Sequence, residues 1–85
     1  MTTREILRQN AGQHIGYQPQ SVAETTLRPG HDTPFLRRLN HMPSKISAYF
    51  HFDKIAAVWK TLYGNLEQEY YIIVATDGTC FHVEY

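Results

Sequence analysis

Cys80, His82 and Glu84 are spaced two residues apart, so they form one row if the segment is a strand. A thiol, an imidazole and a carboxylate are the groups of a cysteine nucleophile with its base and its orienting acid. Residues i and i+2 on a strand lie about 6.5–7 Å apart at Cα. At that separation a hydrogen bond of about 3 Å between the two side chains is difficult to form. No glycine-rich loop or helix start lies beside Cys80 in the sequence. We therefore predict no catalytic residue and a non-enzymatic protein.

Histidines are the second group that could do chemistry, since His31, His41, His51 and His82 are four of the five in the chain. A zinc site needs three or four converging ligands, usually with a paired spacing. The sequence has no second cysteine and no H-x-x-x-H. His51 and His82 with Cys80 would make only a partial site. The sequence thus predicts neither a metal nor another cofactor.

The cationic side chains Arg28, Arg37 and Arg38 are candidates for contacts with nucleic acid or with an acidic partner. Residues 1–45 carry six basic and three acidic side chains, a net charge of +3, whereas residues 46–85 carry two basic and five acidic ones, a net charge of −3. Nine of the eleven aromatic residues lie in the acidic half, away from the cations that base stacking would need nearby. Nucleic-acid binding is therefore the alternative hypothesis.

Composition and length limit the other function classes. A chain of 85 residues is one small domain with a modest core, which favours binding over a deep catalytic cleft. Its single cysteine cannot form an intramolecular disulfide, and the sequence has no apolar run long enough for a signal peptide or a membrane span. We expect a soluble protein of the cytoplasm that does not insert into a membrane.

The N-terminal part, residues 1–33, reads as a loosely structured arm. A short helix is predicted from Thr2, which with Glu5 makes a capping box, to a stop at Gly12. Glycine and proline punctuate the polar segment that follows. Within it, Ser21–Leu27 fits either a short helix or an edge strand.

Residues 34–85 are predicted to form a compact α+β core. Thr33 and Pro34 indicate the start of a helix over Pro34–His41. The alternation of KISAYFHFD predicts a strand over Lys45–Phe52. Asp53 then caps a predicted helix over Lys54–Tyr63, whose apolar stripe includes Val58 and the core residue Trp59.

The C-terminal segment is predicted to be a hairpin with the two-residue turn Asp77-Gly78. That turn sets Thr76 opposite Thr79 and Ile72 opposite Val83, with both pairs on the core face. The opposite face then carries an amphipathic set: Tyr71, Ile73, Ala75, Cys80, His82 and Glu84. Together with the preceding strand and helix, the hairpin makes a β-α-β-β unit, a three-stranded sheet packed on one helix.

This second face is the predicted docking surface, because Tyr and His combine apolar area with a polar tip, as protein interfaces do. Its proposed partner-binding residues are Tyr49, His51, Tyr71, Ile73, His82 and Glu84. We expect a small regulator, adaptor or inhibitor that docks on a larger protein. Two alternatives stay open: the N-terminal arm covers this face, or an edge strand pairs with a second copy to give a homodimer.

Overall fold

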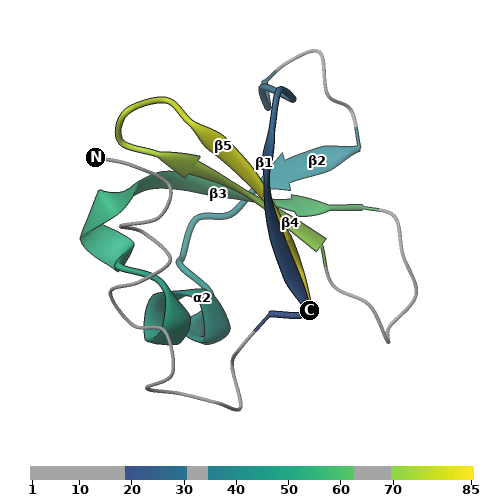
Figure 1. Ribbon diagram of the computed structural model, residues 1–85. Helices are drawn as coiled ribbons and strands as arrows, with labels where there is room; N and C mark the ends of the chain where they lie inside the picture. Colours follow the sequence, from purple (N-terminus) through teal and green to yellow (C-terminus); the bar gives the residue numbers. More distant parts are fainter. Residues whose placement is uncertain (1–18, 31–34, 63–69) are drawn as a thin grey trace.

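Five antiparallel strands form one sheet in the computed structural model, which describes residues 19–30, 35–62 and 70–85 (Figure 1). Their order is β1-β5-β4-β3-β2. The strands are β1 (Ser21–Thr25), β2 (Leu36–Arg38), β3 (Ile55–Thr61), β4 (Tyr70–Ala75) and β5 (Cys80–Glu84). One short helix, α2 (Ser44–Tyr49), and a 3-10 turn (Phe52–Lys54) complete the described elements. The predicted fold class was therefore wrong: the sheet has five strands, and the β-α-β-β unit is not present.

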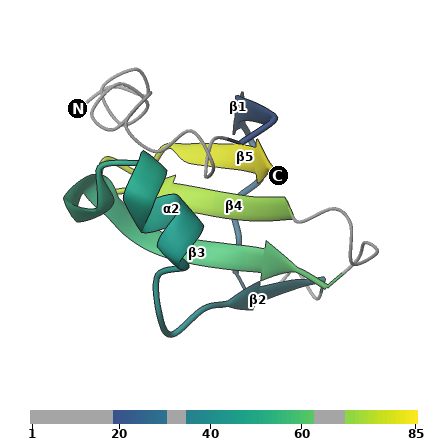
Figure 2. The same cartoon turned by 90° about the horizontal axis from the view of Figure 1, so that it is seen from below.

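The main core lies between α2 and one face of the sheet (Figure 2). Its buried side chains come from α2, β3, β4 and β5 or from the residue after α2: Ile46, Phe50, Val58, Tyr71, Ile73, Ala75, Phe81 and Val83. Tyr85 joins the edge of this core, where its hydroxyl donates to the Lys45 carbonyl at 3.2 Å. A helix of six residues is not stable alone, so this packing holds α2 in place.

The predicted strand over Lys45–Phe52 was wrong, because Ser44–Tyr49 is the helix α2. Ile46 and Phe50 are four residues apart, a spacing that puts both on one face of a strand and equally on one face of a helix. Pro43 precedes the helix at φ −59°, and its carbonyl accepts the first helical hydrogen bond, from the Ser47 N–H at 3.0 Å. Because Ser44–Tyr49 is a helix and not a strand, Phe52 does not share a face with Ile46 and Phe50. It lies outside the core and is 60 % exposed.

The predicted helix over Lys54–Tyr63 was also wrong, because most of it is the strand β3. Ile55 pairs with Ala75 and Ala57 pairs with Val74, so Ala56 is an extra residue in a β-bulge. The bulge lets Ile55 and Val58, three residues apart, face the same core. A helix-like spacing thus arises in a strand, and the β-branched residues and Trp59 suit a strand locally.

The predicted helix over Pro34–His41 contains instead the short strand β2, which pairs with the end of β3. Arg37 lies opposite Lys60 and Arg38 opposite Trp59, and the Leu39 N–H donates to the Val58 carbonyl at 2.9 Å. Pairing with β3 outweighs the local helix signal of this segment, as tertiary contacts commonly outweigh weak propensities.

The C-terminal hairpin is confirmed, but its predicted register was wrong by one residue. The loop has three residues, Thr76–Gly78: the Ala75 N–H donates to the Thr79 carbonyl at 2.8 Å, and the Gly78 N–H to the Ala75 carbonyl at 2.9 Å. Gly78 adopts φ 92°, the left-handed residue that such a loop requires. Asp77 accepts a hydrogen bond from the Thr79 N–H at 2.9 Å, which lowers the pKa of its carboxyl group. The slip reverses the two faces of β4.

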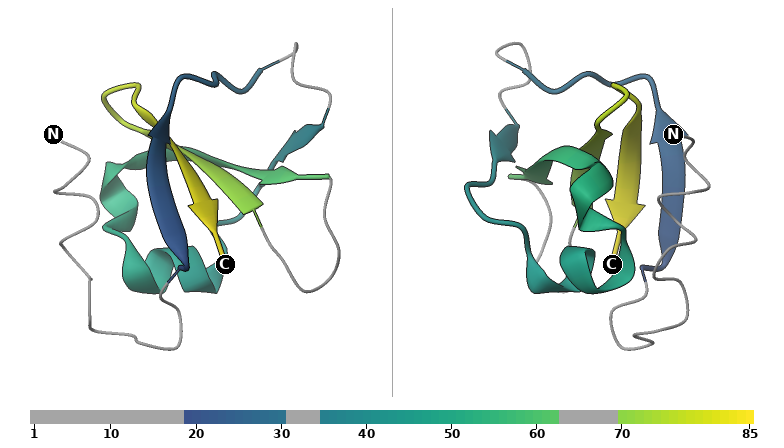
Figure 3. Two further views of the ribbon diagram at one scale, coloured as in Figure 1. Left: turned by 45° about the vertical axis from the view of Figure 1, so that its right-hand side comes forward. Right: turned by 90° about the vertical axis from the view of Figure 1, so that its left-hand side faces the viewer.

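The face of the sheet that is turned away from α2 is covered in part by the connection that follows β1. Residues 26–30, the described part of this connection, lie on the side of the sheet opposite α2 (Figures 1 and 3). The Arg28 guanidinium ties it to the hairpin, donating to the Gly78 carbonyl and lying 3.3 Å from the Cys80 sulfur. Ile72, on this face, is only 2 % exposed, so both faces of β4 are shielded. Residues after β1 therefore shield Cys80 on this face, whereas Tyr71 and Ile73 of the predicted second face are covered by α2 and not by the arm.

Several predictions for the N-terminal part have different outcomes. The edge-strand alternative for Ser21–Leu27 is confirmed, because β1 pairs with β5 at one edge of the sheet. The predicted helix from Thr2 to Gly12 lies outside the described residues. Among the described helices, none has the length and apolarity that crossing a membrane would need.

Replacing Gly78 should destabilise the fold more than replacing Gly30, the other glycine of the described residues. We expect Gly78→Ala to lower the free energy of unfolding by about 1–2 kcal/mol, because a side chain at positive φ is strained. Gly30→Ala is the matched control: nothing lies within 4 Å of the added carbon and its φ is not in the left-handed region. It should be neutral or stabilise by up to about 1 kcal/mol. Urea denaturation of both variants measures the difference, and equal effects would contradict the three-residue loop.

Candidate protein-binding site

The residues of the predicted docking surface do not form one surface, because the hairpin register separates them. Tyr71 and Ile73 lie beneath α2, 4 % and 1 % exposed, and pack against Phe50 and Phe81 in the core cluster. His82 and Glu84 lie on the opposite face of the sheet. Tyr71 and Ile73 are thus not accessible to a partner in this fold.

Tyr49 and His51 lie at the end of α2, half-buried and away from His82. The Tyr49 ring meets the Phe50 ring edge to face at 5.0 Å, so it serves the core. The Nδ1 atom of His51 is 3.2 Å from a carboxylate oxygen of Asp53, but the geometry does not make a hydrogen bond. These two residues therefore border the helix layer and do not extend a sheet surface.

His82 and Glu84 make local contacts within the sheet. The His82 ring stacks on Tyr70 with centroids 5.4 Å apart, and Glu84 lies 3.5 Å from the Ser21 hydroxyl, which donates to it. Cys80, the first residue of the same row, is 1 % exposed beneath Arg28. A buried thiol is not a nucleophile that a substrate can reach.

A cluster of cations lies where β2 pairs with β3; we call Arg37, Arg38 and Lys60 the basic edge. Arg37 stands directly opposite Lys60, so two like charges face each other across the strands. Like charges in this position are destabilising. Within residues 19–30, 35–62 and 70–85, none of the three forms an ion pair with an acidic side chain. The basic edge therefore carries Arg37 and Lys60 on one face of the sheet and Arg38 on the other, and none of the three has an ion-pair partner among the described residues.

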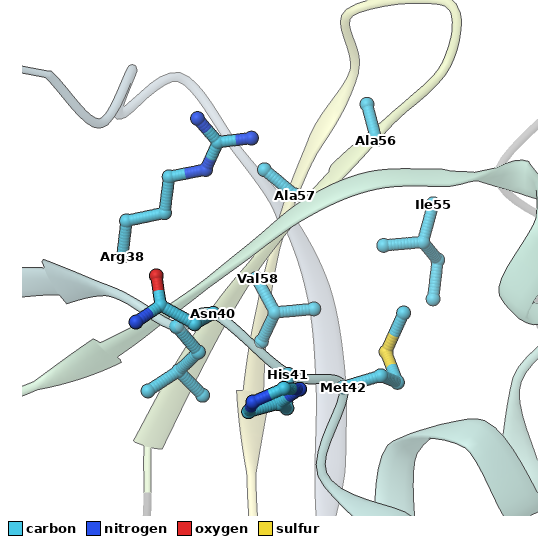
Figure 4. A pocket seen from close by; sticks show the side chains of 9 residues that line it. Arg38, Asn40, His41, Met42, Ile55, Ala56, Ala57 and Val58 are labelled. Carbon is cyan, nitrogen blue, oxygen red and sulfur yellow. The ribbon is translucent and has the colours of Figure 1, made fainter.

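A groove of about 180 Å³ adjoins the basic edge, between the chain that leaves β2 and the start of β3 (Figure 4). We call it the edge groove; its lining residues are Arg38, Leu39, Asn40, His41, Met42, Ile55, Ala56, Ala57 and Val58. A second hollow, about 330 Å³, is lined by Arg37–His41 and so shares four residues with it. Arg38, Asn40 and His41 are exposed, whereas Met42, Leu39 and Ile55 pack partly into the core. The groove thus has a polar, cationic rim and an apolar floor.

The side chains of the basic edge are hydrogen-bond donors of the kind that recognise anions. In the part of the chain that the structure describes, no three His, Cys, Asp or Glu side chains gather as metal ligands would. Arginine supplies a planar fork of donors that matches a carboxylate or a phosphate. The candidate site is therefore one for anions with adjoining apolar groups.

Sequence reasoning identified Arg37 and Arg38 as cations with a binding role but missed Lys60 and the edge groove. Both depend on the pairing of β2 with β3, two segments that the sequence pattern assigned to helices. Arg28, the third predicted cation, lies apart on the covering connection, bonded to Gly78. Only knowledge of the pairing would have pointed to Lys60.

Comparison with known proteins found no match: no family model, no curated protein and no solved structure is similar to this chain.

Proposed function

We propose that this chain is a non-enzymatic binding protein, a small regulator, adaptor or inhibitor, that docks on a larger protein through its basic edge. The partner presents an acidic surface to Arg37, Arg38 and Lys60. The observation that carries the proposal is the Arg37–Lys60 pair, two facing cations that form no ion pair with an acidic side chain among the described residues.

The energetic cost of that pair is the reason to assign it a role. Like charges directly opposite on neighbouring strands are destabilising, by an amount similar to the roughly 0.2–1 kcal/mol that opposite charges contribute. Binding surfaces commonly retain such local costs, because the same charges contribute to partner recognition and to the rate of encounter. An acidic partner would turn the repulsion into attraction.

A non-enzymatic role in the cytoplasm fits the other described features. The edge groove is small, and the Cys80 thiol is buried and unpaired. A free thiol persists in a reducing compartment, which supports the cytoplasm as the location. Self-association through an edge strand stays a prediction.

Nucleic acid is the second candidate, and one observation favours it. Arg38 lies opposite Trp59 on the face that also carries Arg28, so cations and an aromatic ring share one side of the sheet. Phosphate contacts and base stacking use such a combination. The apolar floor of the edge groove favours a protein partner, because phosphate and sugar groups do not fill an apolar floor as an aliphatic or aromatic side chain does.

Arg37→Glu should separate stability from binding. It replaces a like-charge pair with an opposite-charge pair, so we expect the free energy of unfolding to rise by about 0.2–1 kcal/mol. Capture of the acidic partner from an extract of the source cells should fall by about ten-fold or more, the equivalent of about 1.4 kcal/mol. Denaturant titration and quantitative affinity capture measure the two effects.

The double variant Ala23→Glu/Thr26→Glu is the control, because it changes the net charge equally at and beside β1, the opposite edge of the sheet. It should capture the same protein as the wild type. Capture that survives Arg37→Glu would contradict the proposal. Capture that nuclease treatment abolishes, with a steep loss of affinity as salt rises, would favour nucleic acid instead.

A further inference from the structure

We infer that the edge groove binds a linear segment of the partner in which an apolar side chain is flanked by carboxylates. This inference rests on the proposed function, because it assigns to the basic edge the acidic flank of that segment. It adds the apolar anchor and the place where the anchor sits.

The hollow exists because two chain segments diverge. The Leu39 N–H donates to the Val58 carbonyl where the pairing of β2 with β3 ends, and beyond it the chain turns away through Asn40 and His41. At the same point the bulge at Ala56 bends β3. Alanine at 56 and at 57 leaves the space between the segments unfilled.

The two sides of the groove differ in chemistry, as Figure 4 shows for the labelled side chains. Met42 lies beside Ile55 on one side, and these two half-buried side chains supply an apolar floor that continues through the buried Val58 into the core cluster. Arg38, Asn40 and His41 are exposed at the rim. Sites that anchor an apolar side chain and orient it with a few polar groups have this arrangement.

Charge decides the class of occupant. Arg37 and Arg38 flank the groove, and the lining contains no acidic residue. The arginines would repel a basic segment, and a purely apolar segment would give them no anionic group to bind. A peptide with acidic residues beside an apolar one satisfies both the rim and the floor.

The test is selection of a display library of random peptides on three proteins: the wild type, Ala56→Trp and Ala23→Trp. Ala56 is exposed and lines the groove, so a tryptophan there should occupy the hollow without disturbing the core. Ala23 is an exposed alanine of β1 and serves as the matched control. Selected peptides are then measured by fluorescence polarisation against each protein.

The wild type and Ala23→Trp should enrich peptides with an aromatic or aliphatic residue among acidic ones, and Ala56→Trp should weaken their binding by about ten-fold or more. Replacing the apolar residue of a selected peptide by serine should weaken binding to the wild type equally. Acidic peptides that bind regardless of that residue would overturn the inference and leave the proposed function standing. Enrichment of non-acidic peptides, or no enrichment at all, would overturn the inference; binding that persists in Arg37→Glu would overturn the proposed function as well.

Discussion

Phe50→Ala should lower the free energy of unfolding by about 3–5 kcal/mol, the usual cost of truncating a buried aromatic side chain. Phe50 is 1 % exposed and, with Ile46, fixes α2 on the sheet. Small domains have total stabilities near the lower end of about 5–15 kcal/mol, so this loss should leave a substantial unfolded fraction. Urea denaturation followed by far-UV circular dichroism measures it.

Phe52→Ala is the matched control, and its expected cost is below about 1 kcal/mol because most of its ring is in solvent. The pair also tests the secondary structure. On a strand, positions 50 and 52 would share one face and the two variants would have similar effects. Similar losses of stability would therefore contradict a helix over Ser44–Tyr49.

Ile73→Glu should unfold the domain. The change removes a fully buried Ile, worth about 1.5–3 kcal/mol, and places a carboxylate in the core at a further cost of several kcal/mol. Their sum is comparable to the whole stability of a small domain. We expect collapsed amide dispersion in a proton–nitrogen correlation spectrum and no cooperative thermal transition.

Val74→Glu, on the next residue of β4, tests the hairpin register. Val74 faces away from α2 and is only partly buried, so its replacement should cost about 1–2 kcal/mol and leave a folded protein. With Asp77-Gly78 as a two-residue turn, the order would be reversed, with Val74 in the core and Ile73 outside. An unfolded Val74→Glu and a folded Ile73→Glu would restore that register.

The sequence predicted the C-terminal hairpin because β-branched and aromatic runs flank a strong turn signal, and both strands are present. It did not predict the register, since Asp-Gly fits a two-residue loop and equally the end of a three-residue loop with glycine in the left-handed region. Alternation along β4 could not decide either, because Ile72 and Ile73 are both buried.

The helix and strand assignments of residues 45–63 were exchanged for a physical reason. Ile46 and Phe50 satisfy both periodicities, and the bulge at Ala56 gives β3 the three-residue spacing that a helix would show. The segments were too short for period alone to settle. Tertiary pairing, which no local pattern contains, determined both.

For the candidate site, composition identified the arginines but not their neighbours. The basic character of the first half was visible in the sequence, whereas the Arg37–Lys60 pair and the edge groove depend on two segments meeting in space. The predicted surface was wrong because its register was wrong: one slipped residue exchanges the two faces of β4, whereas Cys80, His82 and Glu84 keep the face predicted for them.

The pairing of β1 with β5 has a consequence for how the chain reaches its native state. The strands β2 to β5 pair with partners that are nearer in the sequence. The pairing of β1 with β5, in contrast, brings together Ser21 and Glu84, which are 63 residues apart. Closing such a long loop costs chain entropy before the stabilising contacts between the strands form, so it slows folding. On the ribosome, β1 would therefore lack its pairing partner until β5 has left the exit tunnel.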